Sequence, residues 1–193
     1  MLNQSDHIIN FTHQFLIAMP GVVDLPFAGS VVYVCEHNER GALGLVINRP
    51  TDIDMVTLFN KIDIKLEISP LLHQPVLYGG PVQTERGFVL HEPKEGETYH
   101  SSLRVPGGLE MTTSKDVLEQ VALGNGPSRF LLTLGYAGWA AGQLEEEVAR
   151  NGWLTVPADE AIIFDTPFEA RQGAAMALLG VSPISLSNEI GHA

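Results

Sequence analysis

The sequence predicts an α+β fold: a single compact domain with a mainly antiparallel sheet or open barrel-like core and three to four flanking helices. Several apolar runs of strand length are joined by turns that are too short for a parallel crossover, which needs a dozen or more residues. The chain has 193 residues, enough to bury a core without a disulfide or a metal. Because no repeat or linker divides it, we expect one domain over 1–193, with residues 1–12 and 183–193 loosely ordered.

The first predicted elements are a strand and a hairpin. An apolar run, Phe15–Met19, is typical of a buried strand and is stopped by Pro20 and the glycine after it. Two further apolar runs, Val31–Cys35 and Ala42–Asn48, flank the turn-forming residues Glu36–Gly41. This pattern predicts a β-hairpin.

The middle of the chain predicts one short helix followed by several short strands. Residues 51–54 offer N-capping side chains before a helix over 54–62, and residues 63–74 are expected to be irregular. Turn residues then separate four expected strands: Pro75–Tyr78, Gly87–His91, Ser101–Val105 and Leu109–Thr112.

The last third alternates helices and strands. Ser114 is expected to cap a helix over 114–123, with Gly124 as its stop. A buried strand, Phe130–Leu134, precedes a glycine-rich turn at 135–142. The remaining expected elements are a helix over 142–151, strands at Leu154–Val156 and Ala161–Phe164, and a helix over 167–179.

Charge and cysteine content restrict the class of protein. Twenty-three acidic against 11 basic residues give a net charge of −12, which repels phosphate backbones and anionic membranes. The single cysteine fits a reducing compartment, the N-terminus lacks the features of a secretory signal, and no apolar run reaches ~18 residues. We therefore expect a cytoplasmic protein without membrane or nucleic-acid partners.

Cys35 is the one side chain with intrinsic reactivity. Cys35 and His37 are two residues apart, so in a regular strand they share a face about 7 Å apart, and an imidazolium could activate the thiol. A redox-sensing thiol is therefore one hypothesis. The apolar run before Cys35 and the carboxylate of Glu36 both raise a thiol pKa. We predict a mostly buried, slowly reacting thiol.

Other chemical signatures are weak. The seven histidines show no metal-ligand spacing, and no nucleophile elbow is present. The glycine-rich residues 135–142 could cradle a phosphate before a helix, but they lack the Lys-Ser/Thr of a P-loop. Glu145, Glu146 and Glu147 would also repel a phosphate there. We predict no cofactor, no metal site, no catalytic residue and no enzymatic activity.

The sequence resembles the YqgE/AlgH family of bacterial proteins over nearly its whole length. The blocks that carry the resemblance include 15–20, 30–50, 79–81, 86–91, 111–118, 134–139, 142–145 and 153–159. The resemblance implies a cytoplasmic protein of unassigned biochemical function. One branch of the family carries a name tied to alginate regulation, so the label of transcriptional regulator is also implied. The family supplies no agreed catalytic residues.

We interpret the chain as a non-enzymatic regulatory or binding protein that contacts a protein or a small ligand. DNA binding is an alternative, which would need Arg40, Arg49, Lys61, Lys65 and Arg86 to cluster. The expected contact surface consists of the polar and glycine-rich interruptions of the apolar pattern: Cys35, Glu36, His37, Asn38, Gly79, Gly80, Pro81, Gly135, Tyr136, Gly138 and Trp139.

Overall fold

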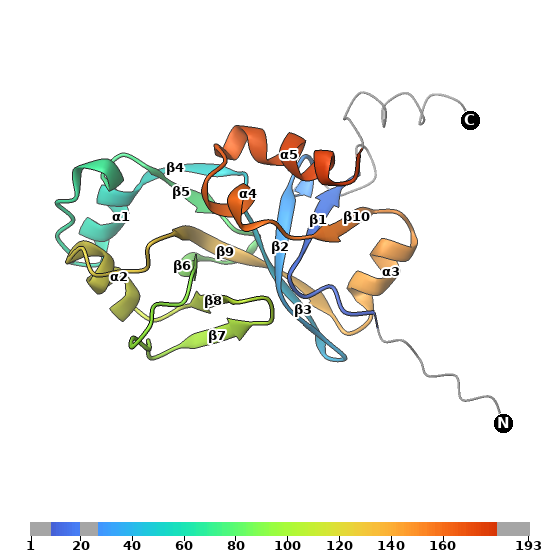
Figure 1. Ribbon diagram of the computed structural model, residues 1–193, viewed down its shortest axis with the longest axis horizontal. Coiled ribbons are helices and arrows are strands. Elements are labelled where there is room, and N and C mark those ends of the chain that lie inside the picture. The colour runs from blue at the N-terminus through green and yellow to red at the C-terminus, as the bar shows by residue number, and fades with distance from the viewer. Residues whose placement is uncertain (1–8, 20–26, 181–193) are drawn as a thin grey trace.

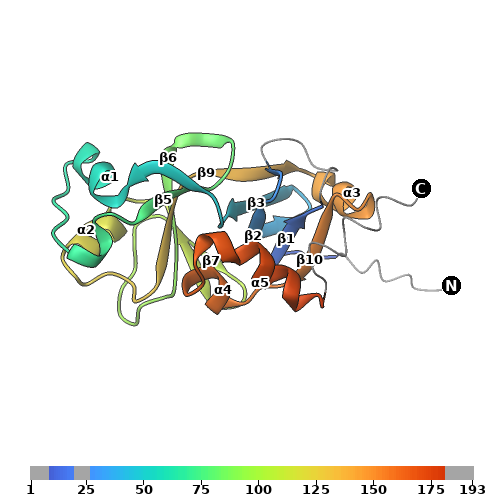
Figure 2. The same ribbon diagram turned by 90° about the horizontal axis from the view of Figure 1, so that it is seen from above.

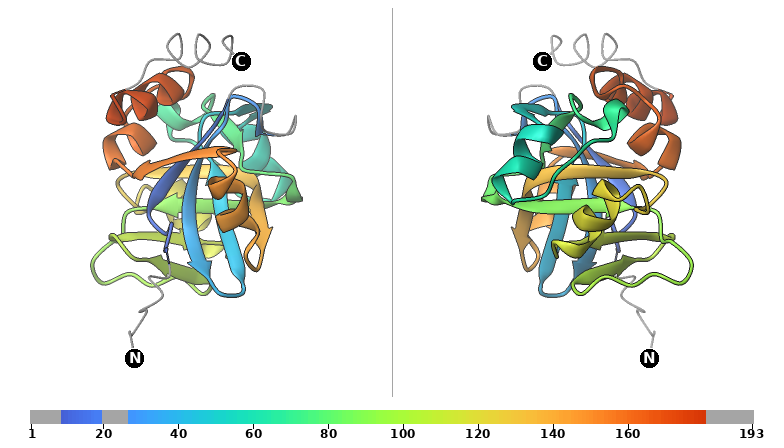
Figure 3. Two further views of the ribbon diagram at one scale, coloured as in Figure 1. Left: turned by 90° about the vertical axis from the view of Figure 1, so that its right-hand side faces the viewer. Right: turned by 90° about the vertical axis from the view of Figure 1, so that its left-hand side faces the viewer.

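A single long strand, β9 (Phe130–Ala140), organises the protein (Figure 1). The computed structural model describes residues 9–19 and 27–180. Within them, ten strands form one sheet in the order β10-β1-β2-β3-β9-β6-β8-β7, and β5 joins β4 to β9. The sheet curls into a half-barrel, as the side views in Figure 3 show. The other strands are β1 (Gln14–Ala18), β2 (Val31–Asn38), β3 (Gly41–Val46), β4 (Pro50–Asp54), β5 (Pro75–Tyr78), β6 (Val82–His91), β7 (Ser102–Val105), β8 (Leu109–Thr112) and β10 (Trp153–Pro157).

Short helices cover the faces and ends of this sheet. They are α1 (Met55–Lys61), α2 (Asp116–Ala122), α3 (Gln143–Ala149), α4 (Glu160–Phe164) and α5 (Arg171–Leu178), with 3-10 turns η2 (Ser69–Leu71) and η3 (Phe168–Ala170). Helices α1 and α2 lie at one end of the long axis and α3 at the other (Figures 1 and 2). The predicted α+β class is confirmed, because the only parallel pair among the described strands is β5 with β9.

The strand β2 is buried on both of its faces, which explains its nearly continuous apolar sequence. Tyr33 packs in one cluster with Ile163 of α4 and Met176 of α5. Val34 faces the opposite side and packs in a second cluster with Leu144 of α3. A third cluster fills the end of the molecule between α1, α2, β5, β6 and β9.

Several predicted elements differ from the structure. Residues 161–164 form α4 instead of a strand, because the carboxylate of Asp159 accepts a hydrogen bond from the N–H of Ala161 and caps a helix. The helix α2 begins at Asp116, and Ser114 does not cap it as expected. The hydroxyl of Ser114 donates to the carboxylate of Asp116 instead of accepting from a backbone N–H of the helix. Asp54 does cap α1, as expected, but the residues before it form the additional strand β4. Five α-helices are described, where the sequence predicted three to four.

The glycine-rich stretch 135–142 was expected to be a turn, and most of it continues β9. Gly135 lies where β9 passes the β5–β6 connection, and a Cβ on it would fall 2.3 Å from the carbonyl oxygen of Gly80. Glycine is used here because two backbones approach closely. Only residues 141–142 form a turn between β9 and α3, so the long glycine-rich loop of a phosphate cradle is absent from this part of the described chain.

Candidate functional site

A β-bulge in β2 decides which side chains meet at the candidate site. Val34 lies opposite Gly44 and Glu36 lies opposite Leu43, so Cys35 is an extra residue in its strand. An extra residue reverses the alternation of side chains beyond it. The side chain of Glu36 therefore shares a face with Leu43.

The bulge separates Cys35 from His37. Cys35 lies in the same cluster as Tyr33 and is buried, as predicted, with 1% of its surface exposed. His37 lies on the other face against Phe11, so the expectation of a shared Cys-His face was wrong. Burial, followed by the charge of Glu36, raises the pKa of the Cys35 thiol far above its ordinary value. Among the described residues, no imidazole forms a hydrogen bond with this thiol.

His37 has a structural environment. Its Nδ1 accepts a hydrogen bond of 2.9 Å from the backbone N–H of Phe11, and its Nε2 contacts the carboxylate of Glu145 in α3. Because Nδ1 accepts, the proton of the ring sits on Nε2 and is donated to the carboxylate. Burial raises the pKa of the Glu145 carboxyl. Hydrogen bonds from its own backbone N–H and from His37 outweigh burial, so the pKa is lowered overall. This contact ties β2 to α3.

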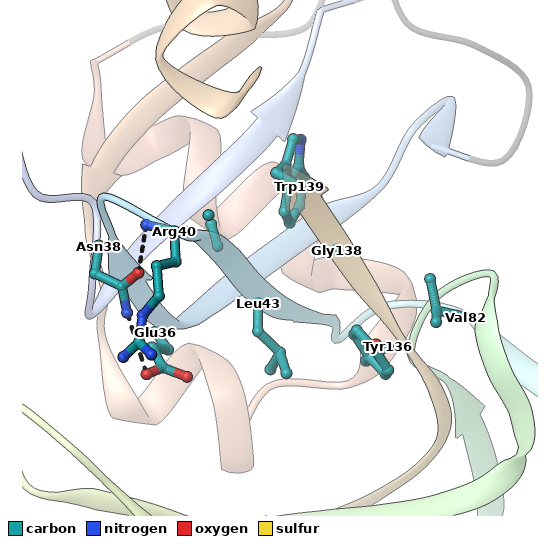
Figure 4. A pocket seen from close by; sticks show the side chains of 10 residues that line it. Glu36, Asn38, Arg40, Leu43, Val82, Tyr136, Gly138 and Trp139 are labelled. Carbon is teal, nitrogen blue, oxygen red and sulfur yellow. Dashed lines mark hydrogen bonds between the residues drawn. The ribbon is translucent and has the colours of Figure 1, made fainter. Parts of the chain in front are cut away.

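An open groove of about 550 Å³ lies over β2, β3 and β9, on the face of the sheet that carries Glu36 and Leu43 (Figure 4). Leu43 and Tyr136 are half-buried and point in the same direction into it. At the hairpin end, Asn38 accepts from the N–H of Arg40 at 2.8 Å and donates to Glu36 at 3.3 Å. The full lining is Glu36, Asn38, Arg40, Gly41, Ala42, Leu43, Val82, Tyr136, Gly138 and Trp139.

The structure brings together part of the surface expected from the sequence. Glu36, Asn38, Tyr136, Gly138 and Trp139 line the groove, whereas Cys35 and His37 do not. The expected surface did not include Leu43 and Val82. Leu43 is part of an apolar run and Val82 follows a proline, so neither carries a signal that separates it from ordinary strand residues.

The remaining expected residues have structural roles where β9 crosses the β5–β6 connection. A Cβ on Gly80 would lie 2.1 Å from the carbonyl carbon of Tyr136, and one on Gly79 would lie 2.3 Å from the oxygen of Gly135. Only glycine permits this close crossing. Pro81 is exposed and directly precedes Val82, at one edge of the groove.

Trp139 borders the groove through its backbone, and its side chain points to the opposite face (Figure 4). Its indole stacks on Phe27 and donates to Glu147 at 2.8 Å. Glu147 also accepts from the indole of Trp153 at 2.8 Å. Glu145 and Glu147 therefore hold α3 on the sheet, a role that the sequence analysis missed.

The described residues contain neither a metal-binding cluster nor a membrane-spanning helix. No group of three or more His, Cys, Asp or Glu side chains in 9–19 and 27–180 is arranged to hold a metal ion. None of the described helices is long and apolar enough to cross a bilayer.

Comparison with known sequences relates the chain to one family. A sequence model described as AlgH-like matches residues 15–184. A UPF0301 protein of Burkholderia vietnamiensis is 70% identical over 193 residues and covers 100% of both chains. A UPF0301 protein of Burkholderia thailandensis is 70% identical over 192 residues, again over 100% of both.

Solved structures show the same relationship. The solution structure of the AlgH protein from Pseudomonas aeruginosa matches with a TM-score of 0.77 and 49% identity, covering 100% of both chains. A crystal structure of a Corynebacterium diphtheriae protein matches with a TM-score of 0.67 over 91% of this chain and 88% of that one. At 22% identity, the second match indicates a shared fold only.

Proposed function

This chain belongs to the AlgH-like family, and we propose that it is a non-enzymatic binding protein that takes a segment of a partner protein in the groove over β2, β3 and β9. The bulge at Cys35 is the observation that carries this proposal. It turns Glu36 out of the regular alternation and places it beside Leu43 on the groove face. Bulges of this kind often re-aim side chains next to functional sites.

The chemistry of the groove suits a polypeptide better than a small molecule. Leu43 and Tyr136 give an apolar floor with an aromatic ring, and tyrosine is enriched in protein interfaces. The rim offers opposite charges, from Glu36 and Arg40, and the amide of Asn38. The groove is open to solvent, whereas small-molecule sites usually enclose most of the ligand.

Site-directed photo-cross-linking tests this proposal. A photoreactive residue at Leu43 is expected to capture a discrete partner from extracts of the native bacterium. The same residue at Leu123, which is 70% exposed and lies beyond α2, is the matched control and is expected to capture none. Charge reversal by Glu36→Lys should abolish the Leu43 adduct. Glu95→Lys, in the exposed loop between β6 and β7, should not.

Three results would contradict the proposal. Equal adducts at Leu43 and Leu123 would exclude a specific groove partner. Saturable binding of a metabolite that depends on Glu36, found by thermal shift, would replace the protein partner with a small ligand. Reproducible turnover by the purified protein would refute the non-enzymatic assignment.

The proposal also expects no specific complex with DNA in a gel shift at physiological salt with competitor. Lys61 and Lys65 belong to α1 and the segment after it, at one end of the long axis, whereas Arg40 lies at the β2–β3 turn (Figure 1). Lys65 is 2.9 Å from Glu67, and Arg86 lies over the ring of Phe88. Sequence-specific retardation of DNA would contradict this expectation.

We place the binding role in the cytoplasm, which the single cysteine favours.

A further inference from the structure

A second cavity, separate from the groove, lies between α1, β5 and β9 on one side and η3 and α5 on the other. Its volume is about 240 Å³. Most of its lining is apolar, and Arg171 is its one charged residue. The lining residues are Met55, Gln74, Pro75, Leu77, Phe130, Leu131, Leu132, Pro167, Phe168 and Arg171.

Arg171 is an unusual residue for such a place, because it is only 6% exposed and forms no ion pair with a described carboxylate. Its Nε donates to the backbone oxygen of Thr166 at 2.9 Å, and its Nη1 donates to the backbone oxygen of Ile47. Burial outweighs the charge of Glu169 and lowers the pKa of Arg171 to about 10. The guanidinium therefore stays charged at neutral pH, and no carboxylate of the described residues forms an ion pair with it.

One side of the guanidinium is left without a partner. Among the described residues, Nη2 of Arg171 makes no hydrogen bond. The only fully buried side-chain polar atom without a partner in the described part of the chain is Oγ of Ser30, so Nη2 is not sealed from solvent. Arg171 lines the cavity, so this is where we expect a bound group to reach the free donors of Nη2.

We propose that this cavity binds a small monocarboxylate with an apolar body, whose carboxylate accepts hydrogen bonds from Arg171. A buried cation is stabilised by a hydrogen-bonded anion, and a guanidinium matches the geometry of a carboxylate. A single negative charge balances a single guanidinium. A phosphate dianion would leave one charge uncompensated against apolar walls, which costs free energy. The apolar lining from Met55, Leu77 and Leu132 fits an aliphatic chain or an aromatic ring.

Isothermal titration of the full-length protein with hexanoate and with hexanamide tests the charge requirement. The two probes have nearly the same size and differ in charge, so hexanoate is expected to bind at least about tenfold more tightly. Arg171→Gln should remove that difference. The control Arg104→Gln, whose side chain is 87% exposed on β7, should leave it unchanged. Equal binding of the acid and the amide, or no binding of hexanoate at about 10 mM, would overturn the proposal.

Arg171 also ties together the backbones of Ile47 and Thr166, so Arg171→Gln could unfold the protein. A second variant, Phe168→Ala, leaves the guanidinium in place and removes part of the apolar wall. It should weaken hexanoate about tenfold and acetate hardly at all. Equal weakening of both would contradict an apolar ligand body.

An N-acetylated dipeptide that ends in a free leucine carboxylate tests whether the carboxylate belongs to a free small acid or to the C-terminus of a polypeptide. Tighter binding than hexanoate, with the same dependence on Arg171, would assign the site to a chain terminus.

Discussion

The thiol of Cys35 belongs to the apolar cluster on the face of β2 that α4 and α5 cover. Because it is 1% exposed and its pKa is raised, first by burial and then by Glu36, the thiolate form is scarce in the native state. We expect a thiol reagent at pH 7 to label the native protein at least about 100-fold more slowly than the protein unfolded in urea. Complete labelling of the native protein within seconds would restore the redox-sensor hypothesis.

Glu147 serves both tryptophans of the chain, since it accepts a hydrogen bond from the indole N–H of Trp139 and of Trp153. The variant Glu147→Ala leaves two largely buried donors without an acceptor and should lower the free energy of unfolding by about 2–4 kcal/mol. Urea unfolding followed by circular dichroism measures this loss. The emission wavelength of tryptophan in the native protein should also shift, because both tryptophans of the chain lose their hydrogen-bond acceptor.

The exposed Glu146 is the matched control for this substitution. Its carboxylate forms an ion pair with Arg150, one turn later on the surface of α3. Surface pairs of this kind contribute about 0–1 kcal/mol. If Glu146→Ala costs as much as Glu147→Ala, helix propensity or net charge explains the loss and the shared indole acceptor does not.

At the candidate site, the sequence indicated the right neighbourhood but not its geometry. The polar residues Glu36 and Asn38 lie between two apolar runs, where they interrupt the apolar pattern, and both line the groove. The faces of Cys35 and His37 could not be predicted, because residues 31–35 are buried on both sides and show no alternation against which a bulge is visible. Arg171 looked like an ordinary helix residue, since its buried environment includes Ile47, which directly follows β3 and is distant in sequence.

Among the elements, the crossing of β9 over the β5–β6 connection depends on one backbone contact. Gly80 has φ +153°, and a Cβ there would lie 2.1 Å from the carbonyl carbon of Tyr136. We expect Gly80→Ala to destabilise the protein by about 3 kcal/mol or more. Gly87→Ala is the matched control in β6, because its Cβ would make an ordinary contact of 3.7 Å with Leu132. Similar unfolding midpoints in urea for the two variants would contradict this account of the crossing.

The start of α2 is held by the carboxylate of Asp116. It accepts hydrogen bonds from the backbone N–H of His100 at 2.8 Å and from the hydroxyl of Ser114 at 2.5 Å. Although partial burial raises it, these hydrogen bonds lower the pKa of Asp116 below its ordinary value of about 3.9. A lowered pKa in the folded state adds stability above the unfolded-state pKa, and this stability is lost as the pH falls through the folded value.

We therefore expect Asp116→Asn to lower the free energy of unfolding by about 1–2 kcal/mol at pH 7 and to have almost no effect near pH 2. Urea titrations at a series of pH values give this difference directly. Asp52→Asn, at an exposed position of β4, should show no such pH dependence. A difference between wild type and Asp116→Asn that persists at pH 2 would show that the carboxylate charge is not its origin.

Local signals predicted an element where they agreed with its tertiary surroundings. Pro75–Tyr78 and Leu109–Thr112 are bounded by turn residues and match β5 and β8 to the residue. Residues 161–164 are apolar and include two β-branched isoleucines, which favours a strand, yet a cap at Asp159 and packing under α5 make them helical. The glycines at 135–142 read as a turn because the need for close strand contact cannot be distinguished from the need for chain reversal.

At the scale of the whole molecule, β9 joins regions that would otherwise be separate. Its first half pairs with β5 and β6, next to the cluster under α1 and α2, and its second half pairs with β3. The sequence predicted one antiparallel α+β domain because short turns dominate it. It could not reveal that one strand of eleven residues connects both halves, since Gly135 and its neighbours looked like the end of that strand.

This connection predicts that the two halves unfold together. Native-state hydrogen exchange in low urea should give the same opening free energy and the same urea dependence for Val34 of β2 and Val89 of β6, which lie in clusters on either side of the strand. Leu132→Ala in β9, a residue that is 4% exposed, should lower both values by about 2–4 kcal/mol. A loss confined to Val89, or a smaller urea dependence there in the wild type, would mean that the end carrying α1 and α2 opens on its own. The chain would then consist of two cooperative units that β9 merely links.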